Sequence, residues 1–372
     1  MTSAHWIETW SSILQSWHAV SDLIRARLGA QLLSGTRARS PAAAVERLLG
    51  IQAQDVRGFR LAVRSRTTGL TVSDLDRALA DRELVVGWLN RGTLHLVRAE
   101  DYWWLHALVA PRQESGNRRR LRQEGVSEAQ AVRGVGVVAD AVAADGPQSR
   151  DALRARLDAA GVPTAGQALV HVLFAASIAG HILRGPMAGS EQCFVAAGAW
   201  IGPAPAPLDP DELLARLARR YLAGHGPAAP EDLAAWAGIP LGAARRAVAS
   251  VAGETAPVAG GLVTLEGAGE PAPLPEPRLL GPFDPLLHGW KSRDLVVGAH
   301  RAVVTVNGIF RPIALVEGRA VATWRMPGGV VTLDPLEPLP TTVVDALARD
   351  AELVLRYLEL PVRPMVVGPA RR

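Results

Sequence analysis

The segment SDLDRALADRELVVGWLNRGTLHLV, residues 73–97, predicts a short helix followed at once by a β-hairpin. Ser73 belongs to the residue types that cap helices. The stretch 85–97 consists of two β-rich halves, separated by Asn90, Arg91 and Gly92. Asparagine and glycine favour the tight turns that join antiparallel strands. A helix and a hairpin in this order form the second half of a winged helix.

Two helices expected before this segment complete the winged-helix plan. Residues 21–34 have helical periodicity, and residues 40–50 begin with a capping Ser40 and with Pro41, which suits a first helical turn. A second region repeats the plan, with helices at 127–144, 149–162 and 168–180 and a Gly- and Pro-tipped hairpin at 181–197. A third region places helices at 211–226, 230–239 and 240–252 before a short strand at 261–267.

The end of the chain has a different pattern. Residues 301–308, 311–318 and 319–326 alternate apolar and polar side chains and break at glycines, which predicts an antiparallel sheet, and residues 341–358 predict a closing helix. We therefore expect an α+β fold in which about three tandem winged-helix domains form a concave DNA-binding surface beside a C-terminal β-rich region. The expected parts are an N-terminal extension (1–18), winged helices at 19–125, 126–205 and 206–270, and the C-terminal region (271–372).

Composition and cysteine content narrow the class of protein. The chain has 372 residues, of which 48% are hydrophobic, enough for several cores, and its longest apolar runs are too short to span a membrane. No export signal is visible. Cys193 is the only cysteine, which excludes an intrachain disulfide and suits the cytoplasm, and we expect it to be a buried small hydrophobe. No coiled-coil or dimerisation helix is evident, so we expect a monomer.

The positive charge is carried by arginine. Basic residues exceed acidic ones by 40 to 36, and Lys291 is the only lysine. Arginine suits phosphate and guanine edges, although a GC-rich genome also produces an arginine-rich chain. The segment 111–123 concentrates this charge, with Arg118, Arg119 and Arg120 in a row. It suits a phosphate backbone, and a solvated linker between domains explains it equally well.

The motif Gln52, Ala53, Gln54, Asp55 places two uncharged amides in an apolar segment. Residues i and i+2 of an extended segment point to the same side, so the two glutamines are able to share one polar target. Alternatively, they hydrogen-bond to neighbouring backbone. Asp55 has two interpretations: an N-cap for the next helix, or a general base whose water the glutamines orient.

Other reaction classes lack support in the sequence. The histidines are scattered, without the HExxH spacing of a metal site, and are expected to be mostly core residues. GVGVV near residue 134 lacks the preceding strand and third glycine of a dinucleotide loop, and no phosphate-binding GxxxxGK[ST] loop is present. We expect no metal and no cofactor.

Four segments together resemble the winged-helix DNA glycosylases of the AlkZ and YcaQ type. They are LLGIQAQD (48–55), RGTLHLVRAEDY (91–102), LLGPFDPLLHGWKSRDLVVG (279–298) and GIFRPIALVEGRAVATWR (308–325). In that family a Gln, an apolar residue and a second Gln form the catalytic motif of the AlkZ branch. The resemblance implies that Gln52 and Gln54 are catalytic and that the substrate is duplex DNA containing N7-alkylated purines. It implies a monofunctional glycosylase, with repair or self-resistance as its role.

We also expect Arg91, the run Arg118 to Arg120, Lys291 and Arg293 to contact DNA. Asp284 and His288 lie in the FDPLLH segment, whose role the sequence leaves open; docking of the C-terminal sheet through its apolar residues is the simpler reading. The alternative function is a winged-helix DNA-binding or regulatory protein without catalysis.

Overall fold

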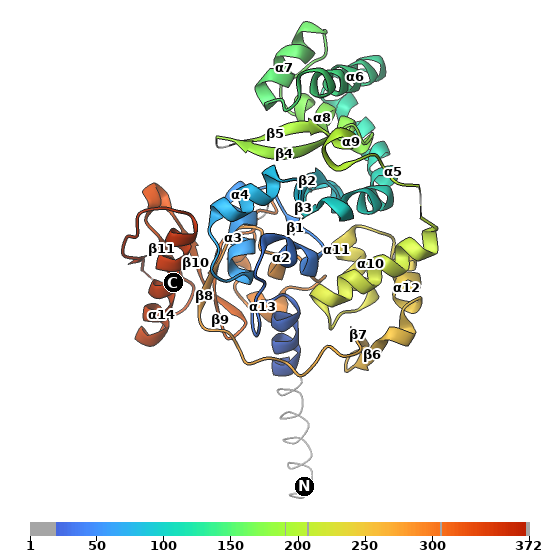
Figure 1. Cartoon of the computed structure of the whole chain (residues 1–372). Helices are drawn as coiled ribbons and strands as arrows, with labels where there is room; N and C mark the ends of the chain where they lie inside the picture. Colours follow the sequence, from blue (N-terminus) through green and yellow to red (C-terminus); the bar gives the residue numbers. More distant parts are fainter. Residues whose placement is uncertain (1–19, 190, 207, 306, 370–372) are drawn as a thin grey trace, which may run out of the picture.

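The computed structural model describes residues 20–369 except 190, 207 and 306, so the predicted extension 1–18 lies outside the described residues. Within this range the fold is α+β, as expected: helices surround two five-stranded sheets and one two-stranded sheet (Figure 1). No helix in the described part of the chain has the length and apolar character needed to cross a membrane.

The first region contains the expected helices and hairpin. Residues 20–30 are helical, and the elements that follow are α2 (Pro41–Leu48), β1 (Ile51–Gln52), α3 (Val56–Arg66), α4 (Val72–Ala80), β2 (Leu84–Trp88), η1 (Asn90–Gly92) and β3 (Leu94–Arg98). Ser40 caps α2 as predicted, because its hydroxyl accepts from the amide of Ala43 at 3.1 Å. The prediction that Ser73 opens α4 is wrong: the cap is Thr71, whose amide donates to the carboxylate of Asp74.

The second region begins with one long helix. Its elements are α5 (Ala99–Gln123), α6 (Glu128–Asp145), α7 (Arg150–Ala159), α8 (Ala168–Ile178), β4 (Ile182–Ala188), β5 (Glu191–Ala196) and α9 (Ala197–Ile201). The linker interpretation of residues 111–123 is wrong, because they form the second half of α5. Asn117 and Leu121, one turn apart, are both buried, and the Asn117 amide donates to the His171 carbonyl of α8. This face of the helix therefore packs while the arginines point outward.

The two predicted wings of these regions belong to a single sheet. Its strand order is β1-β3-β2-β4-β5, and Val86 of β2 pairs with Arg184 of β4. The predicted boundary at residues 125 and 126 still falls between α5 and α6. What the sequence did not predict is that the two hairpins are joined edge to edge, with one hydrophobic core on each face of the first hairpin.

The third region packs against the first. Its elements are α10 (Pro210–His225), α11 (Pro230–Ala237), α12 (Leu241–Ala249), η2 (Ala252–Glu254), β6 (Thr255–Val258) and β7 (Leu262–Leu265). The expected strand is β7, and the sequence analysis missed its partner β6, which contains Pro257. Gly224 of α10 lies so close to α2 that a Cβ there would be 2.2 Å from the Arg47 carbonyl oxygen. A larger residue at this position would push the two helices apart.

The C-terminal region is a sheet closed by a helix. Its elements are β8 (Arg278–Leu280), η3 (Pro285–Leu287), α13 (Asp294–Val297), η4 (Arg301–Val303), β9 (Ile313–Val316), β10 (Arg319–Arg325), η5 (Pro327–Gly329), β11 (Thr332–Pro335), α14 (Thr341–Tyr357) and β12 (Val366–Val367). The sheet order is β12-β11-β10-β9-β8, and β12 joins β11 in parallel.

Most predictions for this region are confirmed, with one exception. The closing helix is α14, and the predicted strands 311–318 and 319–326 contain β9 and β10. Trp324 of β10 is buried, and its indole donates to the Leu280 carbonyl at 2.8 Å. The stretch 301–308 is not a regular strand: it starts as the 3-10 turn η4 and has one bridge, between Val304 and Phe310. Outside this region, Cys193 of β5 is buried, as expected.

A fully buried ion pair fixes the C-terminal region to the first region. Both guanidinium Nη atoms of Arg66, at the end of α3, donate to the carboxylate of Asp284 at 2.8 and 2.9 Å. The Gln31 side chain accepts from the same guanidinium. Asp284 also accepts from the Leu286 amide and so begins η3. Asp284 of the FDPLLH segment thus has a structural role, which the explanation by docking of apolar residues had not included.

Candidate active site

The two glutamines stand at the end of the short strand β1. Gln52 is paired with His95 of β3, and the next residue, Ala53, donates its amide to the Leu94 carbonyl at 2.7 Å. Beyond Ala53 the chain leaves the sheet. Gln52 is consequently buried, at 7% exposed, whereas Gln54 is exposed at the surface. The motif thus supplies one amide inside the protein and one outside.

A chain of hydrogen bonds fixes the orientation of both amides. Arg91 donates from Nη2 to Oε1 of Gln52 at 3.3 Å, and Nε2 of Gln52 donates to Oε1 of Gln54 at 2.5 Å. A guanidinium group is only a donor, so Gln52 must present its carbonyl to Arg91 and its NH2 to Gln54. Gln54 must in turn present its carbonyl to Gln52. Among the described residues, nothing else bonds to the Gln54 side chain, so one lone pair of its carbonyl and its NH2 group are left for a ligand.

Asp55 caps the following helix. Its Oδ1 accepts from the Gly58 amide at 2.6 Å, and its backbone is extended, as the N-cap position of α3 requires. Pro282 lies next to Gly58, where an added Cβ would be 2.5 Å from the Pro282 carbonyl oxygen. The capping interpretation of Asp55 therefore describes its contacts in this structure.

Arg91 occupies the tip of the first hairpin and bridges two parts of the protein. Its backbone is left-handed, with φ of 56°. Besides bonding to Gln52, its guanidinium donates from Nη1 to the carbonyl of Trp236, at the C-terminal end of α11. Helix C-termini carry unpaired carbonyls that favour cations. Arg91, which the sequence predicts to contact DNA, thus also holds the side chain of the buried Gln52.

A second group of side chains, from the segment after β8, approaches the same place. His288 lies against Phe310 with ring centroids 3.9 Å apart, and the guanidinium of Arg293 lies 4.9 Å from the Phe310 ring centroid. Arg293 also donates from Nε to the Leu287 carbonyl at 3.1 Å. Burial lowers the pKa of His288 well below its ordinary value, and the positive charges of Arg91 and Arg293 lower it further. The imidazole is therefore neutral at physiological pH.

His95 is a second neutral imidazole in this group. Burial, and then the charge of Arg91, lower the pKa of His95 to about 3. Its Nδ1 lies 3.0 Å from the Thr93 carbonyl, which only accepts, so Nδ1 carries the proton. The candidate site contains two arginines and two neutral histidines around two amides, and none of these groups is a strong base.

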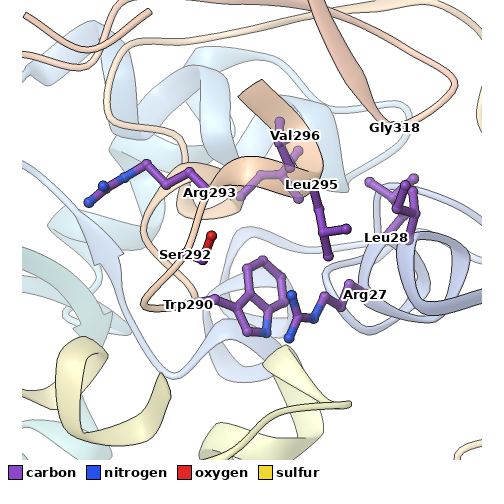
Figure 2. Close-up of a pocket in the computed structure, with 10 residues that line it drawn as sticks. Arg27, Leu28, Trp290, Ser292, Arg293, Leu295, Val296 and Gly318 are labelled. Carbon is purple, nitrogen blue, oxygen red and sulfur yellow. The ribbon is translucent and has the colours of Figure 1, made fainter. Parts of the chain in front are cut away.

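A small pocket adjoins this site without being part of it. Ile24, Leu28, Leu286, Trp290 and Val296 give it apolar walls, and Arg27 stacks on the Trp290 indole at 4.5 Å. Figure 2 shows that the Arg293 side chain points away from the pocket. The pocket therefore touches the candidate site only through this arginine.

The other predicted DNA contacts are exposed side chains on two other parts of the chain. Arg118, Arg119 and Arg120 are exposed on the second half of α5, and Arg118 pairs with Glu114 at 2.6 Å. Lys291 is exposed beside Arg293, and its backbone amide donates to Asp232 of α11. The structure thus brings Arg91 to Gln52 and Arg293 to Phe310 beside His288, whereas the arginine run lies on the second half of α5. Among the described residues, no three His, Cys, Asp or Glu side chains are grouped as a metal site would require.

Comparison with known proteins identifies the family of this chain. The family model "DNA glycosylase AlkZ-like" matches residues 45–357. The chain belongs to the AlkZ-like DNA glycosylase family. A curated AlkZ-like relative, the "Interstrand DNA cross-link repair glycosylase" of Streptomyces sahachiroi, is 28% identical over 365 residues, which cover 91% of this chain and 96% of the relative.

The solved structure of the Streptomyces sahachiroi DNA glycosylase AlkZ has the same fold. The match has a TM-score of 0.77 at 26% sequence identity, covering 94% of this chain and 99% of that one. The AlkZ-like family assignment makes this chain a DNA glycosylase, as its sequence predicted, and favours an enzyme over a DNA-binding regulator.

Sequence reasoning did not place the two histidines beside the glutamines. It predicted that most histidines are core residues, which the burial of His95 bears out, and it left the role of His288 in the FDPLLH segment open. Pairing of β1 with β3 places His95 beside Gln52, and the packing of residues 283–293 on Phe310 places His288 nearby. A tertiary contact of this kind has no local sequence pattern.

Proposed function

We propose that this DNA glycosylase is monofunctional and hydrolyses the N-glycosidic bond of N7-alkylated purines in duplex DNA. The observation that carries the proposal is the chain of hydrogen bonds from Arg91 through Gln52 to Gln54, which orients two uncharged amides without a strong base beside them. A reaction supported by such a site needs a leaving group that departs easily. A purine alkylated at N7 carries a positive charge and meets this requirement.

The proposed reaction uses Gln54 to place the water. As the bond between C1′ and N9 breaks, its electron pair moves to the base and neutralises the cation, while the sugar becomes electron-poor. A water held by the free lone pair of the Gln54 carbonyl adds its oxygen to C1′ and releases its proton to solvent. The carbonyl dipole also stabilises the positive charge on the sugar. The products are a free alkylated base and an abasic site, with no strand cleavage.

Bulky lesions, including interstrand crosslinks, are the substrates that we favour. The exposed position of Gln54 supports this, since a group at the surface reaches a lesion that cannot swing into a deep pocket. The printed name of the Streptomyces sahachiroi relative gives that protein crosslink repair as its activity. We infer a cytoplasmic monomer that protects its cell from a DNA-alkylating natural product.

We further propose how the duplex is held. Arg91 and Arg293 contact the DNA backbone near the lesion, while Lys291 and the run Arg118 to Arg120 contact phosphates farther away. This assignment is supported by the exposure of Lys291 and of the three α5 arginines. It keeps the three-domain winged-helix description, with the duplex lying along the tip of the first hairpin and the second half of α5.

The test is base excision from duplexes that contain one defined lesion. Purified protein is incubated with N7-methylguanine and with a bulky N7-alkylguanine, and abasic sites and released base are measured. We expect release of the bulky base by the wild type and its loss in Gln54→Ala. If neither lesion is excised, the proposed substrate class is wrong. Strand cleavage that accompanies excision without added base would contradict the monofunctional mechanism.

A further inference from the structure

His288 has a buried nitrogen that lacks a partner. Its Nε2 is inaccessible to solvent and forms no hydrogen bond within the described part of the chain. A buried polar atom left unpaired costs on the order of 1–3 kcal/mol, so such an atom calls for an explanation. The ring itself is well fixed, between Phe310 at 3.9 Å and Phe283 at 6.1 Å between centroids.

The surroundings of His288 are positively charged. Among the neighbouring charges, those of Arg91 and Arg293 have the largest electrostatic effects on His288, and the two guanidinium groups also repel each other. Each guanidinium uses only part of its donors, because Arg91 bonds to Gln52 and Trp236, and Arg293 bonds through Nε to Leu287. Two arginines placed together, each with donors left over, form an arrangement that favours an anion between them.

On this basis we propose that Arg91, His288 and Arg293 form a site for one DNA phosphate next to the lesion, in which binding of the phosphate uncovers Nε2 of His288 and lets it donate to a phosphate oxygen. The proposal rests on the proposed glycosylase function and adds a residue to its substrate contacts. It also explains why the site is beside Gln52. Arg91 binds Gln52 and the phosphate together, so the backbone of the lesion nucleotide is positioned relative to the amide that holds Gln54.

Two other roles for His288 fit the charges less well. A general base must accept a proton, and an imidazolium between two guanidinium groups would be repelled by both. A pocket for the alkylated base itself would place a cationic purine against the same two arginines. The phosphates are the negatively charged groups of the substrate, and a neutral imidazole that donates a hydrogen bond from Nε2 suits one of them.

The test is a scan of single backbone charges. Each duplex contains a tetrahydrofuran analogue of an abasic site. In a series of such duplexes, a single uncharged methylphosphonate replaces one of the flanking phosphates, at a different position in each duplex. The dissociation constant of each complex is measured by fluorescence anisotropy. In the wild type we expect one flanking position where the methylphosphonate weakens binding most. In His288→Ala the penalty at that position should shrink by about tenfold, the size of one charge-assisted hydrogen bond, and the other penalties should not change.

Two further variants keep the experiment decisive. His288→Gln places an amide NH2 at about the reach of Nε2 and should retain the penalty, whereas the shorter His288→Asn should lose it even if the alanine variant fails to fold. His181→Ala, at an exposed histidine ahead of β4, is the matched control and should behave as the wild type. Equal penalties in the wild type, His288→Ala and His288→Asn at every phosphate would overturn the proposal.

The binding scan separates this inference from the glycosylase proposal. Wild-type protein that shows the position-specific penalty and excises no alkylpurine contradicts the proposed substrate class and leaves the phosphate site standing. If the wild type excises alkylpurines but its methylphosphonate penalties equal those of His288→Ala, the phosphate site is contradicted and the glycosylase proposal stands.

Discussion

Arg91 donates a hydrogen bond to the carbonyl of Gln52 at 3.3 Å, and this single contact decides how the amides of the motif face. Because the arginine has no acceptor, the NH2 of Gln52 points to Gln54. The outer glutamine, Gln54, is thereby oriented through Gln52 by Arg91, which lies thirty-nine positions beyond Gln52 in the chain, between strands β2 and β3. Catalysis by uncharged groups depends on such orientation, since neither amide gains reactivity by ionising.

The outer glutamine should matter most for the rate. Gln54→Ala removes the acceptor for the water, and we expect the single-turnover excision rate to fall by about 100-fold, in the range found when one transition-state hydrogen bond is deleted. Binding of an abasic duplex should change little. Gln148→Ala, ahead of α7, is a matched control for loss of an amide, because that amide bonds to the Gly146 and Pro147 carbonyls instead of the motif. An equal rate loss in both variants would contradict the assignment.

Arg91 and Gln52 should act as one unit. Arg91→Met and Gln52→Ala each disturb the orientation of Gln54, and we expect the double variant to excise about as fast as the slower single variant. Neighbours in one hydrogen-bond network are coupled by roughly 0.5–3 kcal/mol, whereas distant sites add. The measurement is a double-mutant cycle on single-turnover rates. Additive losses would mean that Arg91 serves DNA binding alone.

The ion pair between Arg66 and Asp284 should dominate the stability of the C-terminal docking. Both side chains are fully buried, so Asp284→Ala leaves an uncompensated charge and should lower the free energy of unfolding by about 3–5 kcal/mol. Urea denaturation measures this. The exposed pair Arg156 and Asp145 is the matched control, and Asp145→Ala should cost less than about 1 kcal/mol. Similar costs would show that the buried pair contributes no more than a surface one.

Stability should fall as the pH drops from about 6.5 towards 4. Burial lowers the pKa of His225 to about 3, so in this window the unfolded chain binds a proton that the folded protein does not. The free energy of unfolding then rises with pH by about 1.4 kcal/mol per pH unit for this group once the pH is well below 6.5. We expect the slope in His225→Leu to be smaller by that amount, whatever its absolute stability. If the free energy of unfolding of His225→Leu depends on pH as steeply as that of the wild type, residues other than His225 cause the pH dependence.

The arginine run on α5 should control the salt dependence of binding. If each residue contacts one phosphate, Arg119→Ala should reduce the slope of log affinity against log salt by about 0.9, and the triple variant by about three times as much. Binding of duplexes with and without a lesion should weaken alike. Arg154→Ala on α7 removes a charge elsewhere in the protein and serves as the control. A slope unaffected by the triple variant would remove this run from the DNA contacts.

Local sequence patterns predicted the elements well and their meeting points poorly. Ser40, the turn at Asn90 to Gly92 and the closing helix α14 follow from short-range chemistry, and all three were found. Residues 111–123 were misjudged because polar, charged sequence describes both a linker and the exposed face of a helix; buried Asn117 and Leu121 decide between them. The same difficulty applies to the candidate site, because the position of His288 depends on its packing against Phe310, which no local sequence pattern predicts.

The edge-to-edge pairing of β2 with β4 has a mechanical consequence. Rotation of the first two hairpins about a hinge between them would disrupt the pairing of Val86 with Arg184, so we expect the hairpins to move together when a duplex binds. We then expect the duplex to adapt to the protein, and lesions that already kink or unwind their surroundings to be recognised at the lowest energetic cost.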